Sequence, residues 1–300
     1  MPLGLLTGLG AAAAWGTLDL LIALATRRVG SLRVTTWMQL IGATLVALVV
    51  VVTGAPIPTD PAVLFGGALV GLAGAGAYLS YFTGLRIGPI AVVSGVVAAY
   101  GGLTVVLAVL IRGESLDPIQ ALGAVAATVG VVLTGVSFDQ GSRGRFASPG
   151  VIFAVVALVL FASMSIGADI VIDRAPWLSV LFVSRISNAV LSVVILLVAS
   201  TALRRQAAPL MATDVGSDGD RAMARVVIAV ALAATLDIVG LMSFSYGLEH
   251  AETWLVGLAS SFGPAVTIVA AVALLGERLR TIQWVGLAAI LVGMIAIALP

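Results

Sequence analysis

The sequence contains no cysteine, no lysine and only one histidine, and few of its residues are charged. Without cysteine the chain has no disulfide and no thiolate metal site, and one histidine is too few for a His-rich metal site. The absence of lysine excludes a light-driven pump, which holds retinal as a Schiff base on that residue. Charged residues make up 10% of the chain and the formal net charge is +1, so nucleic acid and other polyanions are not expected as partners. We also expect no metal and no cofactor.

Apolar residues, in contrast, dominate the chain. Of the 300 residues 61% are hydrophobic, and the mean hydropathy is +1.19. No soluble core would absorb that much apolar surface, whereas a helix that crosses the roughly 30 Å of hydrocarbon in a bilayer needs about 20 consecutive apolar residues. The first apolar segment lacks the basic start and the small-residue cleavage site of a signal peptide, so we interpret it as a membrane span. The composition predicts a multi-pass protein of the inner membrane, embedded in the lipid bilayer.

Ten apolar stretches, separated by short clusters of arginine, aspartate, glycine and proline, predict ten transmembrane helices. They lie near residues 3–25, 32–53, 62–85, 89–111, 118–137, 149–172, 178–203, 225–248, 253–275 and 281–299. Several of them begin with proline, which the first turn of a helix tolerates because its N–H has no partner there. The longest connection, 204–224, is rich in charge and is predicted to be a solvated loop.

A repeat relates the two parts of the chain. Residues 80–136 align without gaps on residues 243–299, at a constant offset of 163. The matched pairs include Ser80 with Ser243, Gly84 with Gly247, Gly113-Glu114 with Gly276-Glu277, Ile119-Gln120 with Ile282-Gln283, Gly123 with Gly286 and Gly130 with Gly293. This predicts two five-helix domains, 1–138 and 149–300, joined by a linker at 139–148. Because five is an odd number of crossings, the fold predicted is an all-α membrane protein of ten transmembrane helices in two inverted five-helix repeats.

The arginines of the loops are distributed unevenly. Odd-numbered loops hold Arg27, Arg28, Arg33, Arg86, Arg143, Arg145, Arg204, Arg205, Arg221, Arg225, Arg278 and Arg280. Even-numbered loops hold only Arg112 and Arg174. Since cytoplasmic loops are enriched in basic residues, this pattern predicts that the odd loops are cytoplasmic and that both termini lie outside.

Short motifs near the two ends of the chain resemble those of a known family. They are Ala14-Trp15-Gly16 in the first span, the run Gly276-Glu277-Arg278-Leu279 followed by Ile282, Gln283 and Gly286, and a weaker first-half copy, Gly113-Glu114-Ser115-Leu116, with Gly101-Gly102 where the second half has Gly263-Pro264. With the spans and the repeat, they resemble the drug/metabolite transporter superfamily, specifically its ten-helix EamA type. The resemblance covers nearly the whole chain.

The resemblance implies a function. Such proteins are secondary transporters of small organic solutes, and many export amino acids, nucleobases or drug-like compounds by alternating access around a central cavity near helices 1, 3, 4, 6, 8 and 9. It implies a small-molecule substrate, no enzymatic activity, and a monomer or weak homo-oligomer. The family is usually drawn with both termini in the cytoplasm, opposite to the arginine pattern. The direction of transport therefore stays open between export, which we favour, and import, as by a sugar-uptake permease.

Four charged residues fall within predicted spans: Asp19, Asp169, Arg185 and Asp237. Each costs about 2.5 to 3.5 kcal/mol at a helix centre, so a functional role is the first interpretation. Asp237 and Arg185 are predicted at similar depths, and we expect them to interact, directly or through substrate, in the outward half of the cavity. The alternative is a purely structural ion pair. For Asp169 we predict a solvated helix end.

Proton-coupled export would require a carboxylate that changes its protonation, and Asp19 and Asp237 are the candidates. Asp19 shares a helical stripe with Trp15, four residues earlier, although an interfacial or capping role would also explain it. Two further stripes of polar residues are Arg185, Asn188 and Ser192 on the seventh span, and Ser165 and Asp169 on the sixth. Such stripes face protein or water, because lipid cannot satisfy them.

Aromatic residues of the spans are candidates for the wall of an apolar cavity, with packing as the alternative for each. They are Tyr78, Tyr81, Tyr100, Tyr246, Trp254 and Phe262. The glycine-rich run 71–76 has no strand before it, so close helix packing explains it better than a nucleotide loop. We assign Glu114 and Glu277 to the fold and predict a solvated His250. An intramembrane enzyme is the non-transport alternative, but it would need paired catalytic groups at one depth, and no Gly-x-Gly-Asp motif is present.

Overall fold

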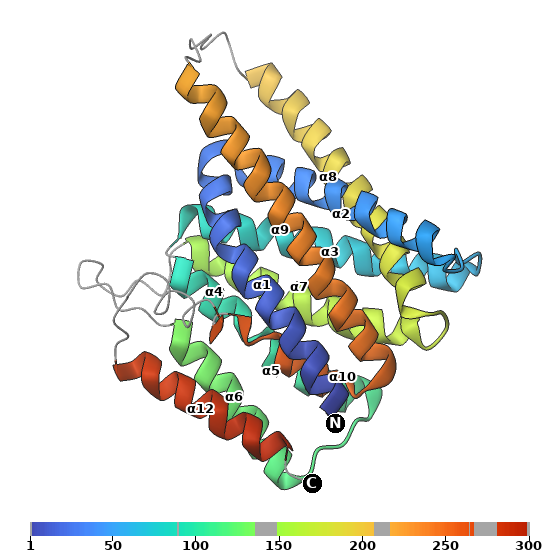
Figure 1. Cartoon of the computed structure of the whole chain (residues 1–300), viewed down its shortest axis with the longest axis vertical. Coiled ribbons are helices and arrows are strands. Elements are labelled where there is room, and N and C mark those ends of the chain that lie inside the picture. The colour runs from blue at the N-terminus through green and yellow to red at the C-terminus, as the bar shows by residue number, and fades with distance from the viewer. Residues whose placement is uncertain are drawn as a thin grey trace.

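The computed structural model describes residues 2–88, 90–135, 149–206, 217–263, 265–266 and 281–298, and all regular elements within these ranges are helices (Figure 1). In the first half they are α1 (Pro2–Val29), α2 (Ser31–Thr53), α3 (Pro61–Ile87), α4 (Ile90–Ala98), α5 (Tyr100–Leu107), η1 (Ala108–Arg112) and α6 (Pro118–Gly135). In the second half they are α7 (Pro149–Ile172), α8 (Trp177–Gln206), α9 (Ser217–His250), α10 (Thr253–Ser260) and α12 (Thr281–Ala298). The predicted linker 139–148, Glu277 and residues 207–216 of the predicted loop 204–224 lie outside the described residues. Residues 204–206 and 217–224 belong to α8 and α9, so the loop prediction is wrong at both of its ends.

Within the described residues six segments are long and apolar enough to cross a membrane, which makes the chain a multi-pass membrane protein. They are Ser31–Thr53, Pro61–Ile87, Val93–Arg112, Gly150–Ile172, Trp177–Ser200 and Met223–His250, and Pro118–Leu133 and Trp284–Ile297 are shorter apolar helices. Large apolar side chains cover their outer faces: Leu110 is 74% exposed and Leu122 71%. In water such a surface would be unstable, whereas hydrocarbon solvates it.

The span predicted near 89–111 is interrupted, because the helix breaks at Ala99 between α4 and α5. The amide of Ala99 donates to the carbonyl of Val96, a tighter i to i−3 hydrogen bond. The second half breaks after α10 in the same way, where the amide of Phe262 donates to the carbonyl of Ala259. Ala99 and Phe262 are separated by the offset of the sequence repeat, so the two breaks are equivalent.

The two broken helices lie against each other close to their breaks. A Cβ on Gly101 would overlap the Ser261 side chain, and one on Gly257 would lie 2.5 Å from the Thr104 side chain. Only glycine therefore allows the two backbones to approach so closely. Hydrophobic periodicity in the sequence did not reveal the breaks, because a helix that is apolar on most of its faces has no clear periodicity to interrupt.

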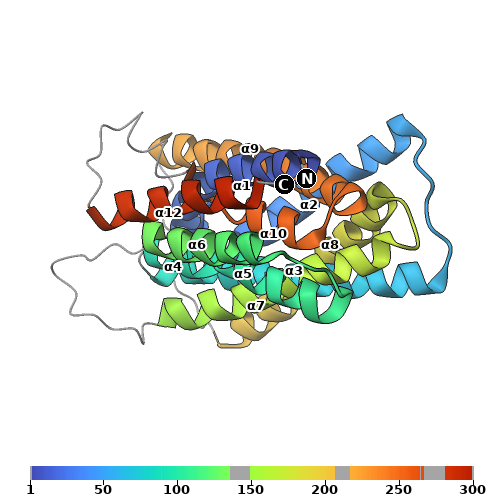
Figure 2. The same cartoon turned by 90° about the horizontal axis from the view of Figure 1, so that it is seen from below.

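Helices of one half pair with helices of the other in a reciprocal pattern. α1 packs on α9 while α3 packs on α7, and α2 packs on α8 while α6 packs on α12 (Figures 1 and 2). The α6–α12 crossing is built from the matched glycines: a Cβ on Gly123 would lie 2.8 Å from the carbonyl oxygen of Gly293, and one on Gly130 would lie 2.7 Å from that of Gly286. Residues later in α6 contact residues earlier in α12. These equivalent helices of the two halves therefore run antiparallel.

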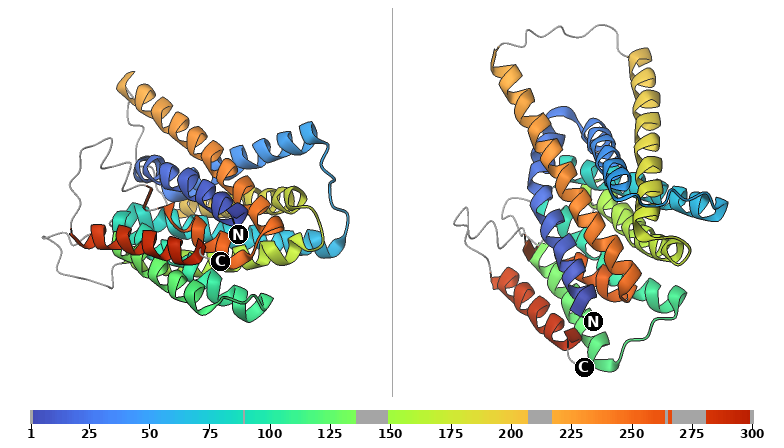
Figure 3. Two further views of the ribbon diagram at one scale, coloured as in Figure 1. Left: turned by 60° about the horizontal axis from the view of Figure 1, so that its bottom comes forward. Right: turned by 45° about the vertical axis from the view of Figure 1, so that its right-hand side comes forward.

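The ends of the helices gather at two opposite ends of the molecule. Gly88, which follows α3, packs against Gly150 at the start of α7, and Gly30, which follows α1, lies near Arg86. The last turn of α8 and the first turn of α9 extend beyond this arginine-rich end (Figure 3). The two chain termini lie close together at the other end (Figures 1 and 2).

Close helix packing at the glycine-rich run of α3 provides a first prediction. A methyl group on Gly71 would overlap the backbone carbonyl oxygen of Ser184 in α8, which moves only if the whole helix moves. We expect Gly71→Ala to lower the free energy of unfolding by about 1 to 3 kcal/mol, as overpacking does. The measurement is unfolding in mixed micelles of increasing SDS content. Gly76→Ala is the matched control, because its methyl group would meet only the end of the flexible Leu160 side chain, and equal losses in both variants would contradict this explanation.

Candidate functional site

A cavity of about 80 Å³ lies among α1, α3, α4, α5, α7 and the turn that follows α10. This volume holds several water molecules, since one needs about 10 to 15 Å³. It is smaller than the roughly 300 Å³ of a typical drug-binding pocket. In this conformation the cavity therefore suits water or a small solute. The predicted residues that line it are Trp15, Asp19, Tyr78, Tyr81, Tyr100 and Ser165.

Asp19 supplies the carboxylate of the cavity. It extends from the middle of α1, is 8% exposed, and accepts a hydrogen bond from the Tyr81 hydroxyl on Oδ2 at 2.7 Å. The Tyr81 oxygen lies 3.0 Å from Ser94 Oγ, and because tyrosine has one hydroxyl hydrogen, Ser94 is the donor of this second bond. Among the described residues, none donates a hydrogen bond to Oδ1 of Asp19. One carboxylate oxygen is thus fixed and the other is available to a solute.

Aromatic rings form much of the cavity wall around Phe161 of α7. The ring centre of Phe161 lies 5.3 Å from that of Tyr78, 5.9 Å from that of Tyr100 and 6.3 Å from that of Tyr81. The Tyr100 hydroxyl, on α5, lies 2.7 Å from Ser260 Oγ at the end of α10. This hydrogen bond joins the two broken helices at the cavity.

Arg185 and Asp237 form a direct ion pair, which confirms the interaction predicted from their depths. Both side chains are buried: Arg185 is 2% exposed and Asp237 is not exposed. The Tyr78 hydroxyl donates to Asp237 Oδ1 at 2.6 Å, and the guanidinium of Arg185 lies 5.6 Å from the centre of the Tyr78 ring and donates to Gln39 Oε1. The ion pair therefore ties α8 and α9 to α2 and α3.

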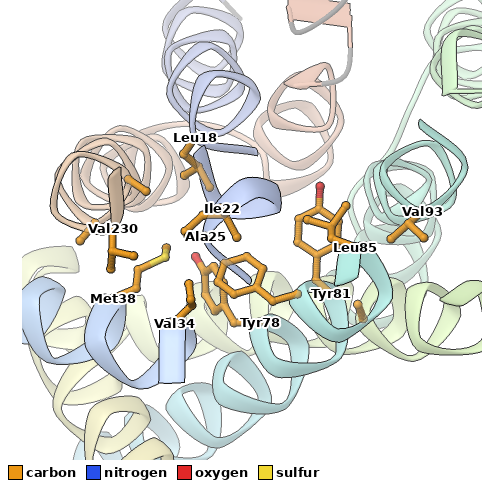
Figure 4. Packing of buried hydrophobic residues seen from close by; sticks show 14 of the residues in the cluster. Leu18, Ile22, Ala25, Val34, Met38, Tyr78, Tyr81, Leu85, Val93 and Val230 are labelled. Atoms are coloured by element: carbon orange, nitrogen blue, oxygen red, sulfur yellow. The ribbon is translucent and has the colours of Figure 1, made fainter. Parts of the chain in front are cut away.

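The ion pair does not line the cavity, however, because Tyr78 separates the two. The Tyr78 ring forms part of the cavity wall while its hydroxyl is bound to Asp237. Figure 4 shows Tyr78 and Tyr81 leaving α3 in different directions, Tyr78 toward Met38 of α2 and Tyr81 away from it. Asp19 in the cavity and Asp237 behind its wall thus belong to two separate buried polar centres.

Three other predicted site residues lie away from the cavity. Asn188 is buried on α8, where Ser192 donates to it in a long bond of 3.4 Å. Phe262 belongs to an apolar cluster with Trp254. Tyr246 is 38% exposed and stacks on the His250 ring, with ring centres 4.2 Å apart. Helical spacing placed these residues in spans but did not indicate which neighbour each would face.

The structure also identifies lining residues that the sequence reasoning missed. They include Ser94, Phe161, Met164, Ser260 and Ser261. The adjacent serines, just before Gly263-Pro264 in an apolar stretch, were a signal that the helix is interrupted there. Phe161 and Met164 gave no such signal, because they resemble every other apolar residue of their span.

The burial of Asp169 contradicts the prediction made for this residue. It is only 4% exposed, and Arg112 at the end of η1 reaches it with Nε 2.6 Å from Oδ2, so the predicted solvated helix end is wrong. The same guanidinium donates two hydrogen bonds to the Asp173 carboxylate, at 2.7 and 3.0 Å. Nearby, the Glu114 carboxylate accepts the amides of Thr253 and Trp254 at 2.9 and 3.0 Å and caps α10, a role in the fold as predicted. These contacts join the two halves at the end of the molecule that has few arginines, which we call the arginine-poor end.

Comparisons with known proteins agree with this architecture. The EamA-like transporter family matches residues 2–136 and 148–299, which are the two halves of the chain. A crystal structure of another protein superposes with a TM-score of 0.73, covering 98% of this chain and 96% of that one, at 21% sequence identity. At that identity the similarity concerns the fold alone. The comparison with curated proteins finds no match.

Proposed function

Because the chain belongs to the EamA-like transporter family, and is therefore a membrane transporter of the drug/metabolite type, we propose that it exports a small organic metabolite by alternating access around the Asp19 cavity. The observation that carries the proposal is the position of this cavity, which contacts helices of both halves and contains a buried carboxylate. Amino acids and related solutes are the substrates we would test first. Import of a solute such as a sugar is the alternative.

We propose ten membrane crossings in two inverted domains, 1–138 and 149–300. In support, α6 and α12 occupy equivalent places in the sequence repeat and run antiparallel. The second helices of the two halves, α2 and α8, also run antiparallel. Thr36 of α2 contacts Ser192 of α8, and Gln39, further along α2, contacts Arg185, which comes earlier in α8. The broken helices also match those of transporters, whose binding sites are commonly formed by discontinuous helices near the membrane centre.

We propose that the arginine-rich end faces the cytoplasm of an inner membrane. The chain has no cysteine, so single introduced cysteines can be labelled without background. In intact cells we expect a membrane-impermeant maleimide to label Thr59→Cys, at the arginine-poor end, and to leave Arg28→Cys unlabelled until the cells are permeabilised. Both positions are exposed. The reverse pattern would place the termini in the cytoplasm and overturn this orientation.

Within the site, we propose that Asp19, Trp15, Tyr78, Tyr81, Tyr100 and Ser165 contact the solute. Arg185 and Asp237 would act as positioning residues, since they hold the Tyr78 ring in the cavity wall. Proton coupling would involve Asp19, the cavity carboxylate whose Oδ1 has no partner among the described residues. A proton bound there would compete with a solute for the same group.

The test is solute counterflow in proteoliposomes, screened across amino acids, nucleobases, sugars and organic cations, with and without a pH gradient. For the solute that is transported, we expect Asp19→Asn to reduce the rate at least about a hundredfold, as loss of a charge-assisted contact in a dry site can do. Asp60→Asn is the matched control, because Asp60 caps α3 at an exposed position and asparagine caps equally well. Unchanged counterflow by folded Asp19→Asn would remove the carboxylate from the mechanism.

A further inference from the structure

The charge carried by the described lining residues of the cavity is negative only. Among its described lining residues Asp19 is the only one with an acidic or basic side chain, apart from the three weakly acidic tyrosines. The nearest guanidinium identified, on Arg185, is already paired with Asp237 and lies behind the Tyr78 ring. A solute carboxylate or phosphate would therefore meet a carboxylate and find no cation in the wall.

The aromatic rings of the cavity wall also favour a cation over an anion. Ring faces carry negative charge density and attract cations, and when several rings surround one point they bind quaternary or alkylated ammonium groups. Here Tyr78, Tyr81 and Tyr100 surround Phe161, and the Tyr81 hydroxyl holds Asp19 at the edge of this group. The carboxylate and the rings thus face the same small space.

The available hydrogen-bonding groups do not compensate for the missing cation. The Ser165 hydroxyl donates to the Phe161 carbonyl, and the Ser260 and Ser261 hydroxyls bond to the carbonyls of Gly257 and Leu258. Most cavity hydroxyls are therefore engaged within the protein. What remains for a solute among the described lining residues is the second Asp19 carboxylate oxygen, the aromatic faces and the indole N–H of Trp15, which is a neutral donor and supplies no positive charge.

From this arrangement we infer that the cavity binds small organic ammonium ions, and that it discriminates against neutral isosteres, zwitterions and anions. The inference rests on the proposed function and narrows its substrate class: among small organic metabolites it favours cationic amines over the zwitterionic amino acids named first for the transport screen. The ammonium group would lie against Phe161 and the tyrosine rings, with Asp19 Oδ1 as its counter-ion.

Three probes of similar size test the inference by direct binding to the purified protein in micelles, measured by isothermal titration calorimetry. Choline is the cation, 3,3-dimethylbutanol is its neutral isostere, and betaine carries the same trimethylammonium group with a carboxylate. We expect choline to bind at least about tenfold more tightly than either of the others, because only choline gains both the ion pair and the cation–π contacts. Betaine or the alcohol binding as tightly as choline would overturn the inference.

Two variants locate the site. Asp19→Asn should abolish choline binding, whereas Asp60→Asn should preserve it. If Asp19→Asn yields no folded protein, Phe161→Leu keeps the carboxylate and an apolar wall but removes the central ring. It should weaken choline severalfold while leaving the neutral isostere unchanged. Choline binding that survives both changes in folded protein would refute the assignment.

Counterflow separates this inference from the proposed function. Transport of sugars or neutral solutes, together with no binding of choline, would refute the cation site and leave the transporter intact. Selective choline binding without counterflow of any solute would support the cation site and overturn the proposed function.

Discussion

Replacing Arg185 with leucine should lower the free energy of unfolding by about 3 to 5 kcal/mol, because it leaves the Asp237 carboxylate buried without its charge partner. Neither side chain has access to solvent that would compensate: they are 2% and 0% exposed. The Tyr78 hydroxyl would still donate a hydrogen bond to Asp237, but a single neutral donor does not compensate for burying an unpaired carboxylate. Unfolding in SDS-containing micelles, with detergent-solubilised wild type beside it, measures the loss.

The double variant Arg185→Leu/Asp237→Leu distinguishes a structural pair from a transport group. Removing both charges leaves no unpaired ion, so we expect the double variant to regain most of the stability that the single variant loses. Because the pair lies behind Tyr78, we also expect measurable counterflow from the double variant. A double variant that is as stable as wild type but completely inactive would place Arg185 and Asp237 in the solute path itself.

Cross-linking η1 to α7 should stop transport entirely. Arg112 joins Asp169 and Asp173 across the two halves, at the arginine-poor end of the molecule, and alternating access requires that end to open. In a chain without cysteine, Arg112→Cys and Asp173→Cys provide the only two thiols. After reaction with a bifunctional thiosulfonate, counterflow should fall to the background of empty liposomes, and reduction of the reagent should restore it.

Two controls accompany the cross-link. The double-cysteine protein must transport before it reacts, which shows that the Arg112 ion pairs themselves are not required. A second pair, Ser115→Cys and Asp117→Cys, lies within one loop of the first half, and cross-linking it should leave transport unchanged. Full transport with quantitatively cross-linked Arg112→Cys/Asp173→Cys would show that the two halves do not separate at this end.

The two buried polar centres have different consequences for the same kind of substitution. Protein groups already neutralise the Asp237 carboxylate. Its replacement should therefore mainly lower the free energy of unfolding. Asp19 has one oxygen without a protein partner, so its loss is felt mainly in solute binding. A comparison of Asp19→Asn with Asp237→Asn, by stability and by counterflow in the same preparation, should therefore show opposite rankings.

Several features of the protein could be predicted from sequence because they depend on composition or on short-range spacing. A bilayer requires long apolar helices, so hydropathy alone indicated a multi-pass membrane protein. The offset between matched glycines and the Gly-Glu pairs indicated two related halves, which the family comparison bears out. Depth along a helix follows from residue number, which is why the Arg185–Asp237 contact was predictable.

The cavity could not be predicted in the same way, because it depends on which faces of distant helices meet. Spacing identified Asp19 and Asp237 as equivalent candidates. Only the packing of α3 against α1 and α9 placed one of them in the cavity and the other behind Tyr78. The contact of Gly101, just after the break at Ala99, with Gly257 and Ser261 likewise joins residues that are far apart in sequence. Hydropathy measures how strongly a segment prefers lipid, whereas the direction of each side chain is fixed by steric fit between helices.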